Sequence, residues 1–168
     1  FARPNEARVT HVALDLRADF AARTLGGEAA LTLVRAPGST RVVLDTRDLA
    51  IEAVSTPDGR PLEFSLGPMD PILGQALDVP LPDGIIGIVV RYHTSPGAAA
   101  LQWLTPAQTA GTRHPYLYSQ GQAILTRTWI PTQDSPGIRQ TYSARIVVPA
   151  PLRAVMSAEA LTPDGVDT

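Results

Sequence analysis

Apolar residues in this chain alternate with polar residues far more often than they recur at the three- to four-residue spacing of a helix. In a strand, every second side chain points to the same face of the sheet, so this alternation is typical of strands with one buried face. The pattern is clearest in Val12, Leu14 and Leu16, in Leu31 and Leu33, and in Leu77, Val79 and Leu81. These three segments are predicted to be half-buried strands.

Turn residues separate the apolar runs at intervals of about ten residues. The segment TPDGRP at 56–61 predicts a hairpin, and RAPGS at 35–39 and LPDG at 81–84 predict further turns. The run from Ile85 to Val90 has few polar positions and is compatible with a strand buried on both faces. The chain contains 16 prolines and 13 glycines, which leaves little room for long helices. The only helical candidates are short pieces at 18–25 and 106–110.

These features predict an all-β fold, a sandwich of mainly antiparallel sheets with little helix. The 168 residues are expected to form one domain, because the chain is long enough to bury a core and shows no linker, repeat or low-complexity tract. Hydrophobic residues make up 44% of the chain and charged residues 18%, as in ordinary globular proteins. The absence of cysteine excludes disulfides and cysteine-based catalysis.

The charge pattern argues against several classes of partner. The net charge is −2, and the 14 Lys and Arg residues are scattered, so neither nucleic acid nor an anionic membrane is an expected partner. No apolar run approaches the roughly 20 residues that span a bilayer. We therefore expect a soluble protein, with the cytoplasm favoured and the periplasm or secretion as alternatives. The chain begins with Phe1, so we expect that a leader or earlier residues have been removed.

No set of residues in the sequence forms a self-sufficient active site. The three histidines, His11, His93 and His114, are far apart, and none has a second ligand or a carboxylate at metal-binding spacing. No GxSxG motif is present. We therefore expect neither catalytic residues nor a metal site within this chain.

The stretch PYLYSQGQAILTRTWIPTQDSPGIRQTY, residues 115–142, holds an unusual set of polar residues. Gln120 and Gln122 flank Gly121, and on a strand their side chains would point to the same face. A buried carboxamide needs hydrogen-bond partners. Two interpretations follow: the glutamines cap backbone groups at a strand end, or they line a ligand cleft in which a carboxamide oxygen accepts from an ammonium or hydroxyl group.

The second half of the stretch is interpreted as scaffold. Asp134 lies between two prolines, so its carboxylate can cap nearby backbone N–H groups or pair with Arg127 or Arg139. Trp103 and Trp129 lie in apolar or strand-like surroundings and are predicted to anchor the core.

The segment from Ala100 to Glu159 resembles the N-terminal domain of the leukotriene A(4) hydrolase and aminopeptidase N family of zinc metallopeptidases, the gluzincin aminopeptidases. The upstream segments HVALDLRADFAARTLGGEAALTL, VVLDTRDLAIEAV and YHTSPGAAALQWL are similar too, so the resemblance covers nearly the whole chain. The general family pattern is met by Arg127, Trp129, Pro131, Asp134 and Pro136, and SQGQA points to the leukotriene hydrolase branch. Thr132 and Gly121 stand where relatives carry Cys.

The resemblance implies a saddle-like, all-β domain placed ahead of a thermolysin-like catalytic domain and a helical C-terminal domain. The HExxH and GxMEN motifs of the family are absent here, so the Zn²⁺ would be bound only in the full-length parent and this fragment would be catalytically silent. Its partners would be its own downstream catalytic domain and, through it, a peptide substrate. By resemblance, Gln120, Gly121, Gln122 and Ala123 line the substrate cleft, with Gln122 holding the substrate's α-amine and Gln120 deeper.

Two functions from different classes remain open. The first is the accessory N-terminal domain of a zinc aminopeptidase, and the second is a free-standing β-sandwich adhesion or binding module. The presence or absence of HExxH in the coding sequence downstream of Thr168 distinguishes them. In the family a further strand follows the position of MSAE, whereas here LTPDGVDT has the composition of a turn. We therefore expect residues 1–168 to lack the last strand of the domain, which leaves an unpaired sheet edge.

Overall fold

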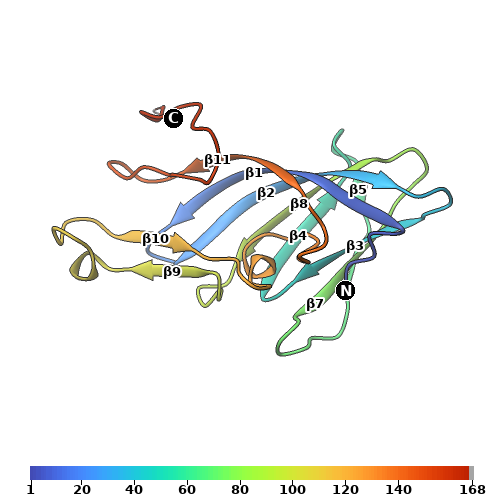
Figure 1. Cartoon of the computed structure of the whole chain (residues 1–168), viewed down its shortest axis with the longest axis horizontal. Helices are drawn as coiled ribbons and strands as arrows, with labels where there is room; N and C mark the ends of the chain where they lie inside the picture. The colour runs from blue at the N-terminus through green and yellow to red at the C-terminus, as the bar shows by residue number, and fades with distance from the viewer. Residues whose placement is uncertain (167–168) are drawn as a thin grey trace.

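A computed structural model describes residues 1–166 and shows an all-β protein (Figure 1). The strands are β1 (Ala7–Asp19), β2 (Thr24–Arg35), β3 (Arg41–Thr46), β4 (Leu49–Ser55), β5 (Pro61–Leu62), β6 (Ser65–Leu66), β7 (Gln75–Pro80), β8 (Gly87–Thr94), β9 (Leu101–Leu104), β10 (Tyr116–Ser119) and β11 (Thr141–Val147). Two single 3-10 turns, η1 (Pro106–Gln108) and η2 (Thr126–Thr128), are the helical elements of the described residues. The predicted fold class is confirmed.

The largest sheet has six strands in the order β11-β1-β2-β8-β4-β5. Its long strands β1 and β2 form an antiparallel hairpin that runs along most of the molecule in Figure 1. All pairs in this sheet are antiparallel except β1 with β11, which run parallel from His11 opposite Thr141 to Arg17 opposite Val147. The strand β11 is therefore at one edge of the sheet, although it comes last in the chain.

The core lies between this sheet and a three-stranded sheet of order β3-β7-β6. Strands β1, β2 and β8 contribute the buried residues Val12, Leu14, Leu16, Leu31, Leu33, Ile88 and Val90, and the smaller sheet contributes Val42, Leu44, Leu77 and Val79. Each fully buried side chain of this size stabilises the fold by about 1.5–3 kcal/mol relative to its exposed form. The alternating positions predicted from the sequence are all buried, so these three strand predictions are confirmed.

Two local predictions are wrong, and both errors have a physical reason. Residues 18–25 are not helical, because β1 continues to Asp19 and β2 begins at Thr24, so the segment is the turn of the long hairpin. The Asp19 carboxylate accepts hydrogen bonds from Ala21 N and Ala22 N in that turn. The run from Ile85 to Val90 is not buried on both faces, since Ile86 precedes β8 and is 65% exposed.

The predicted hairpin at 56–61 is present and joins β4 to β5. The Thr56 hydroxyl donates to the Asp58 carboxylate and accepts from Arg60 N at 3.1 Å. The bond from Thr56 holds the pKa of Asp58 below its usual value. The other two predicted turns link strands of different sheets, β2 to β3 and β7 to β8.

The strands β9 and β10 form a separate two-stranded sheet that projects at one end of the molecule (Figure 1). A second, smaller core attaches this hairpin to the end of the large sheet. It contains Ala18, Leu25, Ala98 and Leu101, with Phe20, Trp103, Leu117, Trp129 and Val148 packed around them. Trp129 contacts both cores, and Trp103 and Trp129 are thus core anchors as predicted. The hairpin fixes the start of the segment that follows β10.

Candidate functional site

The loop that carries Gln120 to Ala123 begins where β10 ends. Gln120 N donates to Ala100 O at 2.8 Å, which adds one more hydrogen bond to the β9–β10 hairpin. The chain then turns back, and Leu125 N donates to Gly121 O at 2.8 Å. A Cβ atom at Gly121 would lie 2.5 Å from Thr126 Oγ1, so glycine allows this close approach. We call residues 120–125 the QGQA loop.

Gln120 and Gln122 lie outside β10, so the same-face arrangement that a strand would give does not apply to them. The strand β10 stops at Ser119, because the loop hydrogen bonds close a turn over residues 122–125 instead of continuing the sheet. The peptide bond between Gln122 and Ala123 is cis. Gln120, Gln122 and Ala123 are nevertheless brought together on one exposed loop.

The two carboxamides of the QGQA loop have different partners. Gln120 Oε1 accepts a hydrogen bond from Gln122 N at 3.1 Å, so this side chain caps the loop's own backbone. Within residues 1–166, the Gln122 side chain makes no hydrogen bond. The capping interpretation of the sequence thus describes Gln120. The Gln122 carboxamide is exposed and has no hydrogen-bond partner among residues 1–166.

The chain becomes buried at Arg127, two residues after the QGQA loop ends, and its polar groups there are hydrogen-bonded. Asp134 Oδ2 accepts from Arg127 N at 3.1 Å and from Arg127 Nε at 3.2 Å. Arg127 Nη2 donates to Asp134 O and Nη1 to Leu73 O, each at 2.8 Å. The Arg127 side chain is only 5% exposed. Of the two arginines considered from the sequence, Asp134 therefore pairs with Arg127 and not with Arg139.

Two further residues complete this buried group, and neither was found from the sequence. Asp45, from β3, accepts from Asp134 N at 2.9 Å through Oδ2, and its side chain is 2% exposed. Gln133 is fully buried; its Oε1 accepts from Val9 N at 2.9 Å, and its Nε2 donates to Ala7 O at 2.8 Å and Val43 O at 3.2 Å. Gln133 thus bridges β1 of the large sheet and β3 of the smaller one. We call Arg127, Gln133, Asp134 and Asp45 the anchor cluster.

The prolines of the predicted motif, Pro131 and Pro136, differ in burial. Pro131 is buried, and Pro136 is exposed at the rim of a hollow of about 520 Å³. Leu73, Ile124, Arg127 and Asp134 also line this hollow. Because Ile124 directly follows Ala123, the hollow connects the QGQA loop with the anchor cluster. Tyr92 of β8 also contacts the segment between the QGQA loop and Asp134, since its buried hydroxyl donates to Trp129 O at 2.9 Å. Burial raises the pKa of the Tyr92 hydroxyl.

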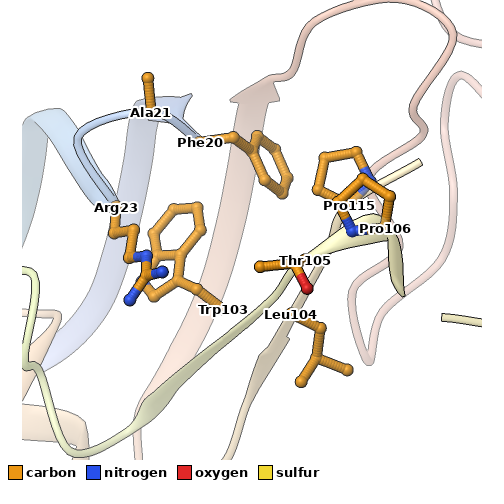
Figure 2. A pocket seen from close by; sticks show the side chains of 8 residues that line it. All are labelled: Phe20, Ala21, Arg23, Trp103, Leu104, Thr105, Pro106 and Pro115. Carbon is orange, nitrogen blue, oxygen red and sulfur yellow. The ribbon is translucent and has the colours of Figure 1, made fainter. Parts of the chain in front are cut away.

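A second hollow, of about 280 Å³, lies between the β1–β2 turn and the segment in which β9 leads into η1 (Figure 2). Phe20 and Trp103 meet there edge to face, with ring centroids 5.2 Å apart, and Arg23, Pro106 and Pro115 complete the wall. The indole Nε1 of Trp103 is buried without a hydrogen-bond partner among the described residues. No residue predicted from the sequence to bind substrate lines this hollow.

Comparison with known proteins identifies the family. The family model of the peptidase M1 N-terminal domain matches residues 8–163. The chain belongs to this peptidase M1 N-terminal domain family. This confirms the resemblance noted in the sequence. Leukotriene A-4 hydrolase of Xenopus laevis is 38% identical over 164 residues, which cover 94% of this chain and 27% of the relative. Leucine aminopeptidase 2 of Sclerotinia sclerotiorum is 34% identical over 89% of this chain and 26% of its own length.

Solved structures of relatives share the fold. Yeast LTA4 hydrolase in complex with bestatin superposes with a TM-score of 0.82 at 28% identity, over 90% of this chain and 24% of the yeast chain. An M1 zinc metallopeptidase from Deinococcus radiodurans has the same fold, with a TM-score of 0.65 over 87% of this chain. The M1 N-terminal domain described here spans about a quarter of the length of the curated relatives it matches.

Possible metal ligands are dispersed over the described residues of this M1 N-terminal domain. Among residues 1–166, no three His, Asp or Glu side chains lie close enough together to hold a metal. His11 is within hydrogen-bonding distance of Thr141 Oγ1 and Ser143 Oγ, and His93 of Glu52 Oε1. In the same described part of the chain, no helix is long and apolar enough to cross a membrane.

Proposed function

We propose that this chain is the N-terminal β domain of a zinc-dependent aminopeptidase and that its QGQA loop forms one wall of the substrate cleft. Family membership and the names of the relatives support the parent activity. The observation that carries the role of the loop is the state of Gln122. Its carboxamide is exposed and uncommitted within the described residues, yet its backbone N–H is bonded to Gln120.

A carboxamide at this position suits recognition of a free amino terminus. An exopeptidase must distinguish an α-ammonium group from an internal peptide N–H, and several acceptors around the ammonium achieve this because a peptide nitrogen cannot satisfy them. Gln122 Oε1 would supply one neutral acceptor, and a carboxylate of the downstream domain would supply the charge. Gln120, whose oxygen is engaged by Gln122 N, would offer its NH₂ group as a donor deeper in the cleft.

Under this proposal the catalytic residues and the zinc ligands belong to the downstream domain. The side chains of this chain contribute substrate binding and no step of hydrolysis, in keeping with the poor fit of its residues to a metal. The isolated chain is therefore expected to hydrolyse no aminoacyl substrate. One equivalent of zinc bound through its histidines would contradict this part of the proposal.

The substitution Gln122→Leu in the full-length polypeptide tests the role of the loop. It keeps much of the side-chain volume but removes the acceptor, so kcat/KM for an aminoacyl substrate should fall by an amount worth roughly 1–3 kcal/mol. The melting temperature should not change. Gln102→Leu is the matched control, because Gln102 is an exposed glutamine on β9, outside the loop. Normal turnover by Gln122→Leu, or a lowered melting temperature with normal kinetics, would show that Gln122 has only a structural role.

The alternative of a free-standing binding module makes a different prediction about the gene. A zinc aminopeptidase requires an HExxH motif with a distant Glu ligand in the coding sequence after Thr168. A reading frame that stops close to Thr168 would favour the binding module and would overturn the proposed parent activity.

A further inference from the structure

A single buried hydroxyl closes the base of the QGQA loop. Thr128, the last residue of η2, is 1% exposed. Its Oγ1 accepts a hydrogen bond from Ala100 N at 3.0 Å and donates to Leu125 O at 2.7 Å. The hydroxyl thus acts as donor and acceptor at once, and it links the last residue of the loop, Leu125, to Ala100, which precedes β9.

The same residue that donates to Thr128 also holds the start of the loop. Ala100 N donates to Thr128 Oγ1, and Ala100 O accepts from Gln120 N at 2.8 Å. The loop's first residue and the segment that follows the loop are therefore linked through one residue, Ala100. Leu125 N also donates to Gly121 O, which closes the turn that contains Gln122, Ala123 and Ile124.

Removal of the Thr128 hydroxyl would affect Ala100 N more than Leu125 O. Leu125 O also accepts from Thr128 N at 2.9 Å, so it keeps a partner without the side chain. Ala100 N, which is buried, has Thr128 Oγ1 as its partner and would lose it. The link that the hydroxyl controls is therefore the one between the end of the loop and the β9–β10 hairpin.

We propose that Thr128 is a positioning residue that fixes the QGQA loop against the hairpin and thereby sets the place of the Gln122 carboxamide. This inference rests on the proposed function, in which that carboxamide meets the substrate's α-amine. Thr128 itself is buried and does not contact substrate. Its effect on the reaction would pass entirely through the loop.

The test compares Thr128→Val with Thr128→Ser in the full-length polypeptide. Valine keeps the shape of threonine without the hydroxyl, whereas serine keeps the hydroxyl. We expect Thr128→Val to lower kcat/KM for an aminoacyl 4-nitroanilide about tenfold, mainly through a higher KM, as for a lost buried hydrogen bond. Thr128→Ser should remain within about twofold of the parent. Hydrogen exchange should rise in peptides that cover 118–126 and stay unchanged in those that cover β1 and β2.

A double-mutant cycle separates positioning from a general loss of stability. If Thr128 acts through Gln122, Thr128→Val has no further effect on KM in a Gln122→Leu background, whereas independent effects multiply. Multiplicative effects, or normal exchange of the loop in Thr128→Val, would overturn the inference. Thr128→Ala removes the hydroxyl without placing a methyl group against Ala100 N, and it takes the place of the valine variant if that variant does not fold.

The same experiment distinguishes failure of this inference from failure of the proposed function. Normal kinetics of Gln122→Leu together with a loosened loop in Thr128→Val would reject the role of Gln122 in the cleft, and with it the positioning role in the reaction. Impaired kinetics of Gln122→Leu with an unaffected Thr128→Val would reject only the role of Thr128.

Discussion

The QGQA loop and three residues of the anchor cluster, Arg127, Gln133 and Asp134, lie within 15 residues of sequence, yet Gln122 of the loop differs from these three in how its side chain is bonded. In the anchor cluster, Arg127, Gln133 and Asp134 are buried or nearly so, and each bonds to backbone groups of the surrounding strands or loops. In the QGQA loop, Gln122 is exposed and binds no other described residue through its side chain. A polar residue whose bonding capacity is used within the domain is scaffold, and one whose capacity is unused is available to a ligand.

The largest effect on stability is expected when Arg127, the cation of the anchor cluster, is replaced. Arg127→Met would leave the Asp134 carboxylate buried without its guanidinium partner, whereas Asp45 would lose only a 4.0 Å contact and keep its bond from the Phe1 ammonium. Loss of one member of a buried pair costs about 3–5 kcal/mol, so urea denaturation of the 168-residue chain should show a loss of this size. Arg139→Met, at an exposed arginine nearby, is the control and should cost under about 0.5 kcal/mol. Equal effects of the two substitutions would contradict a scaffold role for Arg127.

A smaller loss in the free energy of unfolding is expected when Gln133 is replaced. Gln133→Leu preserves approximate volume but leaves Val9 N, Ala7 O and Val43 O without the carboxamide. Because unsatisfied buried groups cost roughly 1–3 kcal/mol each and some relaxation occurs, we expect a loss of about 2–4 kcal/mol in the free energy of unfolding. Gln120→Leu on the exposed loop should change it by less than about 0.5 kcal/mol. Similar losses at the two glutamines would erase the distinction between the regions.

The smallest predicted effect is on the titration of Asp70, whose carboxylate accepts two backbone hydrogen bonds. Asp70 Oδ1 accepts from Leu73 N and Ile72 N, each at 2.8 Å, and these bonds lower the pKa of Asp70 below its usual 3.8. A depressed folded-state pKa stabilises the folded form above pH 3.8, and this contribution is lost as the pH falls through the folded value. An NMR titration should place the midpoint of Asp70 below 3.8.

Asp70→Asn keeps an acceptor oxygen but does not titrate, so it serves as the control for that measurement. The amide shifts of Ile72 and Leu73 should follow pH below 3.8 in the parent chain and stay constant in the variant. A midpoint at or above the usual value would show that the turn bonds do not favour the charged form.

The sequence predicted the parts of the fold that depend on local pattern. Alternation identified the buried positions of β1, β2 and β7, because a strand with one wet face must repeat every second residue. The same reasoning failed at residues 18–25, where a short apolar run fits a helix turn and a hairpin turn equally well. It also failed at Ile86, since an apolar run does not reveal where its strand begins.

The candidate site also depends on contacts between residues far apart in sequence, which local patterns do not reveal. The sequence drew attention to Gln120 and Gln122, and it left Arg127 and Arg139 as equal partners of Asp134. Nothing near Asp45 indicated that it would meet Asp134, because the two lie 89 residues apart and only the fold brings them together. The burial of Gln133 was missed for the same reason, as its partners come from β1 and β3.

The parallel pairing of β1 with β11 has a consequence for how this domain is made. His11 lies opposite Thr141, which is 130 residues later in the chain. The strand β11 can therefore pair with β1 only after most of residues 1–147 have left the ribosome. Long-range pairing of this kind slows folding, because loop closure must precede the contacts that reward it. During synthesis the outer edge of β1 is therefore bare and open to pairing with other chains. Limited proteolysis of nascent chains stalled before and after β11 would detect the protection that its arrival confers.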